Sequence, residues 1–222
     1  MRTAPRLRFG PATRILSLFV GLVVIAVGIV ALLDSGLGLS PWDVLHQGIA
    51  LHTPLTIGTA SVVVGLVVLV AAWALGQQPG WGTLANAVVI GLAVDVLLSV
   101  DAIAELDVDP LPVRIALVLA GVALFGIGSA LYVGAGVGAG PRDSMMLLLA
   151  RRTGLRIAVV RFTMEAVVVV IGFALGGTVG IGTLMFVALI GPSVEGSFWL
   201  LTRLGLAERA EVSTPVEALT EG

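Results

Sequence analysis

The chain has 222 residues, of which 58% are hydrophobic and 12% charged, with a formal net charge of −2 and a mean hydropathy of +1.10. A soluble globule cannot cover that much apolar surface, so the composition predicts an integral membrane protein in a lipid bilayer and disfavours a nucleic-acid partner. The absence of cysteine excludes disulfides and thiolate chemistry, and two histidines six positions apart do not suggest a metal site. We therefore expect no metal and no cofactor.

The first 14 residues carry four arginines and precede an apolar run at residues 15–33. That run is longer than the apolar part of a typical signal peptide, and no small-residue cleavage site follows it before Asp34. It is interpreted as a retained first transmembrane helix.

A transmembrane helix needs roughly 20 apolar residues, because it rises about 1.5 Å per residue across a core about 30 Å thick. Six segments meet this requirement: residues 15–33, 57–76, 83–100, 113–133, 157–176 and 183–202. Two more segments, 41–52 and 141–152, begin at proline and are too short to span. They are predicted as re-entrant or half-helices.

The fold class predicted is an all-α polytopic membrane protein, and arginine placement orients it. Arg142, Arg151, Arg152 and Arg156 fall on the same side as the N-terminal arginines when six crossings are counted. Both termini are then cytoplasmic in a bacterial plasma membrane. The predicted parts are a basic N-terminus (1–14), membrane repeat 1 (15–100), an acidic outer loop (101–112), membrane repeat 2 (113–203) and a disordered tail (204–222).

The chain repeats itself at an offset of 100 positions. Residues 36–98 (the first copy) align without gaps to residues 136–198 (the second copy), with 21 of 63 pairs identical. The rarer pairs are the most informative: Pro41 with Pro141, Asp43 with Asp143, Gly82-Thr83-Leu84 with Gly182-Thr183-Leu184, and the acids Asp95 and Glu195. Each repeat has three spans and one short helix, and an odd number of spans places the second repeat upside down, as in many secondary transporters.

A parallel arrangement of four plus four spans is the alternative, and it requires the short helices to cross the membrane. It leaves the arginines unexplained, because the loop around the first short helix has none while its counterpart has four. We therefore favour two inverted-topology repeats of three spans each.

The string GLGLSPWDVLHQGIA, followed by a span rich in small residues and by Gly-Thr at a later helix start, resembles the YczE branch of the YczE/YitT family of bacterial membrane proteins. The resemblance covers about residues 21–200. It implies an integral protein of the cytoplasmic membrane, and it implies no particular substrate or reaction.

The starts of the two short helices are the first candidate binding elements for a substrate or ion. Ser40, Pro41 and Asp43 form a helix start in which the acid stabilises free backbone N–H groups. The second copy keeps Pro141 and Asp143 but has Gly140 in place of the serine. Capping alone explains these residues, and paired half-helix ends facing a central cavity would also explain them.

Asp95 and Glu195 are the second pair of candidates, each about twelve residues into a span. A charge at mid-membrane costs about 2.5–3.5 kcal/mol on insertion scales and seldom faces lipid. Either residue could line a polar cavity, although Asp95 is close enough to its helix end for an interfacial role.

Arg161 and Glu165 lie four apart and are expected to form an intramembrane ion pair. Trp42, Trp73, Trp81 and Trp199 are interpreted as interface anchors, and His46 and His52 as polar surface.

The sequence favours a small secondary transporter or permease for a small solute or ion. The alternative is a membrane scaffold or regulatory subunit that acts through its arginine-rich cytoplasmic loop. A homo-oligomer or a membrane partner is compatible with both. An enzyme is disfavoured because no nucleophile and base occur together at plausible depth.

Overall fold

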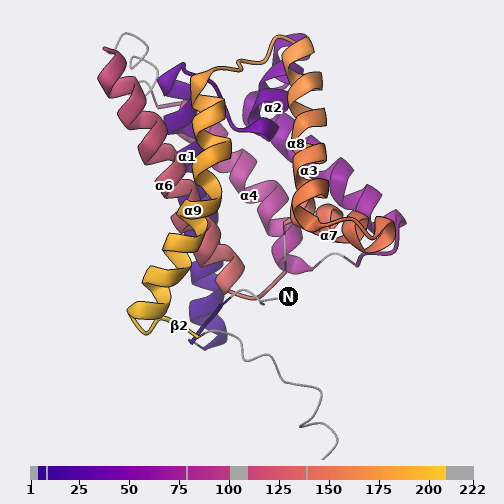
Figure 1. Cartoon of the computed structure of the whole chain (residues 1–222), viewed down its shortest axis with the longest axis vertical. Helices are drawn as coiled ribbons and strands as arrows, with labels where there is room; N and C mark the ends of the chain where they lie inside the picture. Colours follow the sequence, from indigo (N-terminus) through magenta and orange to yellow (C-terminus); the bar gives the residue numbers. More distant parts are fainter. Residues whose placement is uncertain (1–4, 9, 79, 101–109, 139, 209–222) are drawn as a thin grey trace, which may run out of the picture.

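The structure is a computed structural model that describes residues 5–8, 10–78, 80–100, 110–138 and 140–208. Within these ranges the chain forms eight helices and two short strands (Figure 1). In chain order they are β1 Arg6–Leu7, α1 Pro11–Ser35, α2 Pro41–His52, α3 Ile57–Ala74, α4 Trp81–Leu98, α6 Leu111–Gly134, α7 Pro141–Thr153, α8 Ile157–Ala174, α9 Ile181–Arg203 and β2 Ala207–Glu208.

Six of these helices are long and apolar enough to cross a membrane: α1, α3, α4, α6, α8 and α9. They match the six predicted spans. Their outer faces leave large apolar side chains uncovered, and Leu16, Val67 and Val170 are each more than 60% exposed. Surface of this kind needs lipid, so the protein is a multi-pass membrane protein.

Local capping explains where the helices begin and end. α1 starts at Pro11, four residues before the apolar run predicts, because proline suits the first helical position. It ends where Gly36 adopts a φ of 57° and donates its N–H to the Leu33 carbonyl. α4 and α9 begin two residues before the predicted 83 and 183, since each threonine hydroxyl accepts the N–H of the glycine three positions earlier.

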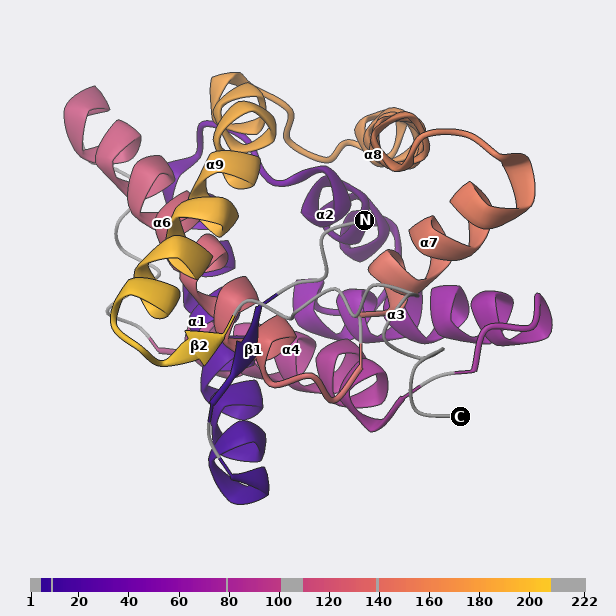
Figure 2. The ribbon, with the colours of Figure 1, turned by 60° about the horizontal axis from the view of Figure 1, so that its bottom comes forward.

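The eight helices form two groups of four, each with two helices from either half of the chain (Figure 2). In the long-helix group, α1 packs against α4 and α6, and α6 packs against α9. In the short-helix group, α2 packs against α3 and α8, while α7 packs against α3 and α8. The main contact between the groups is the one between α3 and α4.

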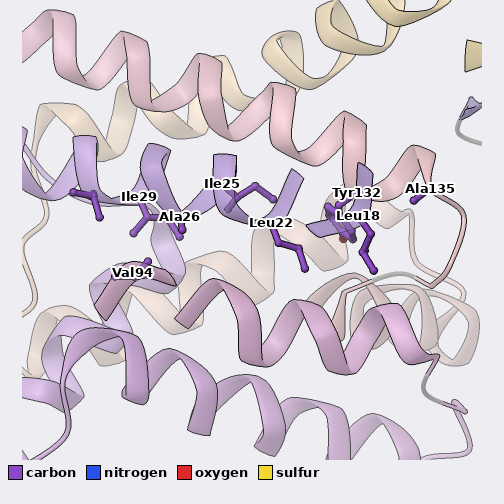
Figure 3. Close-up of a cluster of buried hydrophobic side chains, with 9 residues drawn as sticks. Leu18, Leu22, Ile25, Ala26, Ile29, Val94, Tyr132 and Ala135 are labelled. Carbon is purple, nitrogen blue, oxygen red and sulfur yellow. The ribbon is translucent and has the colours of Figure 1, made fainter. Parts of the chain in front are cut away.

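A hydrophobic cluster holds the long-helix group together. Figure 3 shows Leu18, Leu22, Ile25, Ala26 and Ile29 on one side of α1, close to Val94 of α4 and Tyr132 of α6. All of these side chains are at most 4% exposed. Their burial places α1 between α4 and α6, just as α6 lies between α1 and α9.

Glycines set the close crossing of α1 and α6. A Cβ at Gly21 would lie 2.7 Å from the Gly128 carbonyl oxygen, and one at Gly121 would lie 2.8 Å from that of Gly28. The two contacts are equivalent in the repeat, because Gly21 corresponds to Gly121 and Gly128 corresponds to Gly28. α1 and α6 therefore run antiparallel, and each presents the same small-residue stripe to its partner.

The loops before the short helices show the same equivalence. Gly182 donates its N–H to the Leu37 carbonyl at 2.8 Å, and Gly82 donates to the Val137 carbonyl at 3.3 Å. Each copy thus gives the other an equivalent contact.

The two strands join the segment that precedes α1 to the segment that follows α9. β1 pairs antiparallel with β2, with Arg6 opposite Glu208 and Leu7 opposite Ala207. The expected tail therefore begins with a short ordered ladder, and the otherwise helical fold contains one two-stranded sheet. Residues 101–109 of the expected outer loop and 209–222 of the tail lie outside the described residues.

Candidate functional site

A cavity of about 240 Å³ lies between the two groups, and residues of all eight helices line it. The starts of both short helices reach it: Ser40, Pro41 and Trp42 from the first copy, and Gly140, Pro141, Arg142 and Asp143 from the second. Four of the predicted residues, Ser40, Pro41, Pro141 and Asp143, are therefore brought to one place. The opposite wall, from the long-helix group, is largely apolar and includes Ile25, Phe125 and Phe186.

Arg142 connects the two copies across the cavity. Its guanidinium lies over the Trp42 ring, with Cζ 4.7 Å from the ring centroid. A terminal nitrogen is 3.4 Å from His46 Nε2. A guanidinium can only donate, so Nε2 is the acceptor and the His46 proton is on Nδ1.

The Nδ1–H of His46 in turn faces Asp43, with Oδ1 3.1 Å away. Ser40 donates its hydroxyl to the other carboxylate oxygen and accepts the Asp43 N–H at 3.4 Å. Asp43 is 2% exposed and His46 is fully buried. The predicted Ser40 cap of α2 is confirmed. Asp43 also accepts hydrogen bonds from both Ser40 and His46, and the other ring nitrogen of His46 faces Arg142.

The short helix α2 is not among the six long helices, and the pKa values of its buried Asp43 and His46 are each affected by opposing influences. Burial alone would raise the pKa of Asp43, but the His46 hydrogen bond, the Arg142 charge and the Ser40 hydrogen bond together bring that pKa below its usual value. Burial lowers the pKa of His46 by more than its hydrogen bond to Asp43 raises it. Asp43 is therefore ionised and His46 neutral at pH 7.

Asp143 occupies the equivalent position in the second copy but has different neighbours. Its side chain is exposed, and Oδ2 accepts the Tyr132 hydroxyl at 2.8 Å. The same tyrosine oxygen accepts the Gly140 N–H at 3.1 Å. Tyr132 thus orients the start of α7 and holds one oxygen of Asp143, while no side chain caps this helix.

Arg161 and Glu165 form the predicted pair on α8, with Nε and Oε1 2.8 Å apart. Both line the cavity. The equivalent residues of the first copy, Ser61 and Gly65, line it too and carry no charge. The second copy therefore supplies most of the charge around the cavity.

Asp95 and Glu195 are not among the lining residues of the cavity. Asp95 accepts the Gly58 N–H at 2.9 Å and the Thr56 hydroxyl at 2.6 Å, so it caps α3 from the neighbouring helix. Glu195 is exposed on α9. The structure separates these two acids from the residues at the short-helix starts.

Three residues of the network were misjudged from the sequence. Trp42 stacks on Arg142 in the cavity, whereas an interface anchor was expected, and His46 is fully buried, whereas polar surface was expected. Arg142 was interpreted only as a topology signal. The three-residue spacing of Asp43 and His46 puts both on one face of α2, and this was the signal available.

The fold and the cavity define a multi-pass membrane protein with a charged internal site between two helix groups. The chain belongs to the family of unknown function DUF6198, whose family model matches residues 12–197. An uncharacterized protein of Haemophilus influenzae is 37% identical over 187 residues, covering 84% of each chain. The uncharacterized membrane protein YczE of Bacillus subtilis is 34% identical over 181 residues, 78% of this chain and 80% of its own. The resemblance to the YczE type is thereby confirmed. No solved structure matches the chain.

Proposed function

We propose that this protein is a small secondary transporter or permease, and that the cavity between the two helix groups is its solute site. The observation that carries this proposal is the convergence of both short-helix starts on one cavity, each contributed by a different sequence copy. Half-helix ends at the interface of two repeats are how many transporters present polar groups away from lipid. The residues carry and release the solute and do not transform it.

The transport proposal includes an inverted topology of three plus three spans with both termini cytoplasmic. The equivalent glycine contacts of α1 and α6 support it, because antiparallel partners with equivalent sequences face opposite sides. The pairing of β1 with β2 places the segment before α1 and the segment after α9 at the same end of the molecule, as an even number of spans requires. In Figure 1 the short helix α7 lies in the lower half, toward β2, and α2 in the upper half. The arginines near α7 then fall on the cytoplasmic side.

The size and charge of the cavity limit the solute. At about 240 Å³ it is smaller than the roughly 300–1,000 Å³ of drug-sized pockets, so it suits a small solute or a hydrated ion. Its lining carries two arginines, Arg142 and Arg161, and two acids, Asp143 and Glu165. This balance suits a neutral polar or zwitterionic solute better than a polyanion.

Accessibility of the cavity from both sides distinguishes a transporter from a scaffold. The chain has no cysteine, so Met146→Cys places one thiol in the cavity lining. We expect it to react with a membrane-impermeant thiosulfonate added outside right-side-out vesicles, and also in inside-out vesicles. Reaction from one side only, or from neither, would contradict transport and favour the scaffold.

Three single cysteines control this measurement. Leu22→Cys is fully buried in the long-helix group and should not react from either side. Leu51→Cys lies in the last turn of α2, and Leu204→Cys directly follows the end of α9. Both leucines are more than 60% exposed. The proposed topology requires the first to react only from outside and the second only from inside.

A further inference from the structure

The two helix groups meet mainly where α3 packs against α4, although the second copy contains the equivalent pair α8 and α9. α3 and α4 pack closely, and a Cβ added at Gly58 would overlap the Gly91 carbonyl oxygen. The equivalent helices of the second copy, α8 and α9, hardly touch along their described lengths. A Cβ at Gly191, the counterpart of Gly91, would meet nothing within 4 Å.

The polar residues that join α3 to α4 have counterparts on α8 and α9 that make no equivalent hydrogen bonds within the described residues. In the first copy, Asp95 reaches from α4 to the start of α3, where it accepts the Gly58 N–H and the Thr56 hydroxyl. Its counterpart Glu195 is exposed and has no hydrogen bond or ion pair within the described residues. The same is true of the side chain of Arg156, the N-cap of α8 and counterpart of Thr56. The start of α8 therefore has no side-chain cap.

Three substitutions between the copies fall at positions that would meet if α8 and α9 packed as α3 and α4 do. Gly58 becomes Ala158, so a closure of α8 on α9 would have to accommodate one Cβ that the α3–α4 contact does not contain. Asp95 becomes Glu195, whose side chain is longer by one methylene and is therefore long enough to span a wider gap than Asp95 spans. Thr56 becomes Arg156, so the neutral hydroxyl donor is replaced by a cationic one that pairs with a carboxylate.

We infer that α8 and α9 close on each other in a second conformation, in which Glu195 caps α8 and pairs with Arg156 while the Asp95 contact to α3 opens. The two copies exchange conformations, and the short-helix group rocks against the long-helix group. The cavity then opens alternately beside α8–α9 and beside α3–α4. This inference rests on the proposed transport function, for which it supplies the moving interface.

Cysteine cross-linking tests the closure without any solute. In a disulfide the two Cα atoms are about 4.4–6.8 Å apart, a range that the close contact of Gly58 with Gly91 makes attainable at the equivalent pair. We expect Ala158→Cys/Gly191→Cys to form an intramolecular disulfide in membranes treated with copper phenanthroline. The matched control is Val170→Cys/Leu184→Cys, on the same two helices, whose counterparts Val70 and Leu84 are exposed rather than packed. Yields no higher than this control would overturn the inference.

The acids should shift the yield in opposite directions. Glu195→Gln removes the charge that caps α8 in the inferred conformation and should lower cross-linking by about fivefold, the factor to which a helix-end charge of about 1 kcal/mol corresponds. Asp95→Asn weakens the α3–α4 contact and should raise the yield by a similar factor. A purely structural role for Asp95 would leave the yield unchanged or lower it, and either result would overturn the exchange.

Pulsed electron spin resonance keeps the inference testable if the close cysteine pair disturbs folding. Nitroxides at Val170 and Leu184 sit on exposed faces, where they do not interfere with packing. We expect two distance populations, with the shorter one increased by Asp95→Asn and decreased by Glu195→Gln. A single distance in all three proteins would overturn the inference. Met146 reacting from both sides alongside that result would leave transport standing and reject only this interface as its moving part.

Discussion

Asp43 and Asp143 hold the same position of equivalent short helices, two residues after a proline, yet they have different surroundings. Asp43 is 2% exposed and is held by Ser40 and His46. Asp143 is exposed beside the cavity, and Tyr132 holds one of its oxygens. The difference follows from what changed around the acid: Ser40 became Gly140 and His46 became Met146.

The comparison indicates that the helix start is preserved in both copies, while its carboxylate has different hydrogen-bond partners in each. In the first copy the carboxylate is used internally, as the acceptor of a buried chain that ends at Arg142. In the second copy the serine and the histidine are absent, so the carboxylate and the uncapped helix start remain available beside the cavity. Under the proposed transport function, Asp43 has a structural role and Asp143 contacts the solute.

Exchanging each acid for its amide is the strongest test of this division. Asp43→Asn removes a buried charge on which Ser40, His46 and Arg142 depend, and should cost about 3 kcal/mol of unfolding free energy. Asp143→Asn should cost less than about 1 kcal/mol, because its carboxylate is solvated and an amide oxygen still accepts from Tyr132. Unfolding in detergent micelles titrated with dodecyl sulfate measures both. Equal losses in the two variants would contradict the division.

The Tyr132 hydroxyl is the second-copy substitute for the missing serine. Tyr132→Phe leaves the Gly140 N–H without its acceptor and frees Asp143, which should cost about 1–2 kcal/mol in the same unfolding titration. Ser17→Ala is the matched control, since it removes one hydrogen bond from a serine to the Leu131 carbonyl of the same helix. A loss in Tyr132→Phe no greater than in the control would show that α7 does not depend on this hydroxyl.

Ser40 caps α2 and also supports Asp43. Ser40→Ala should lower the unfolding free energy by about 1 kcal/mol, the usual cost of removing a serine cap. Ser99→Ala, which removes an exposed hydroxyl bonded to the Val96 carbonyl, should change it by less than about 0.5 kcal/mol. If the two variants lose the same amount, the cap contributes nothing measurable.

The smallest expected effect concerns the contact that joins the two copies. Arg142→Lys keeps the charge but loses the planar group over Trp42, which should cost about 0.5–1 kcal/mol and change the tryptophan emission. The measurement uses protein in which Trp73, Trp81 and Trp199 are phenylalanine. In the protein that keeps Trp199 alone, Arg203→Lys is the matched control, because Arg203 stacks on that exposed ring. An unchanged Trp42 emission would contradict the stacking.

Much of the fold could be predicted from the sequence, because each membrane-spanning helix must by itself be long and apolar enough to cross the bilayer. The six long helices were predicted by apolar length alone, and the short helices α2 and α7 by the proline at which each begins. Their ends were less accurate. Hydropathy does not register the glycine and threonine caps that start α4 and α9 two residues earlier.

The site was predicted less completely, because a cavity depends on which helices become neighbours. The repeat pointed to Ser40, Pro41, Pro141 and Asp143, and these residues do meet. It also pointed to Asp95 and Glu195, which are elsewhere, because a matching position shows equivalence and not proximity. Trp42 and His46 have no conserved counterparts in the second copy, so the repeat carried no signal for them.

The sequence by itself determined that the chain resides in a membrane, that it has six segments long and apolar enough to span it and that its two halves are related, since hydropathy and identity are properties of the chain alone. Only the tertiary structure decided that the four-helix groups mix both copies, that Arg142 stacks on Trp42, and that α3 and α4 pack while α8 and α9 remain apart. Packing between distant segments depends on shape and on small local features such as Gly58, which leaves room for the Gly91 carbonyl. These become decisive only when two helices approach each other in space.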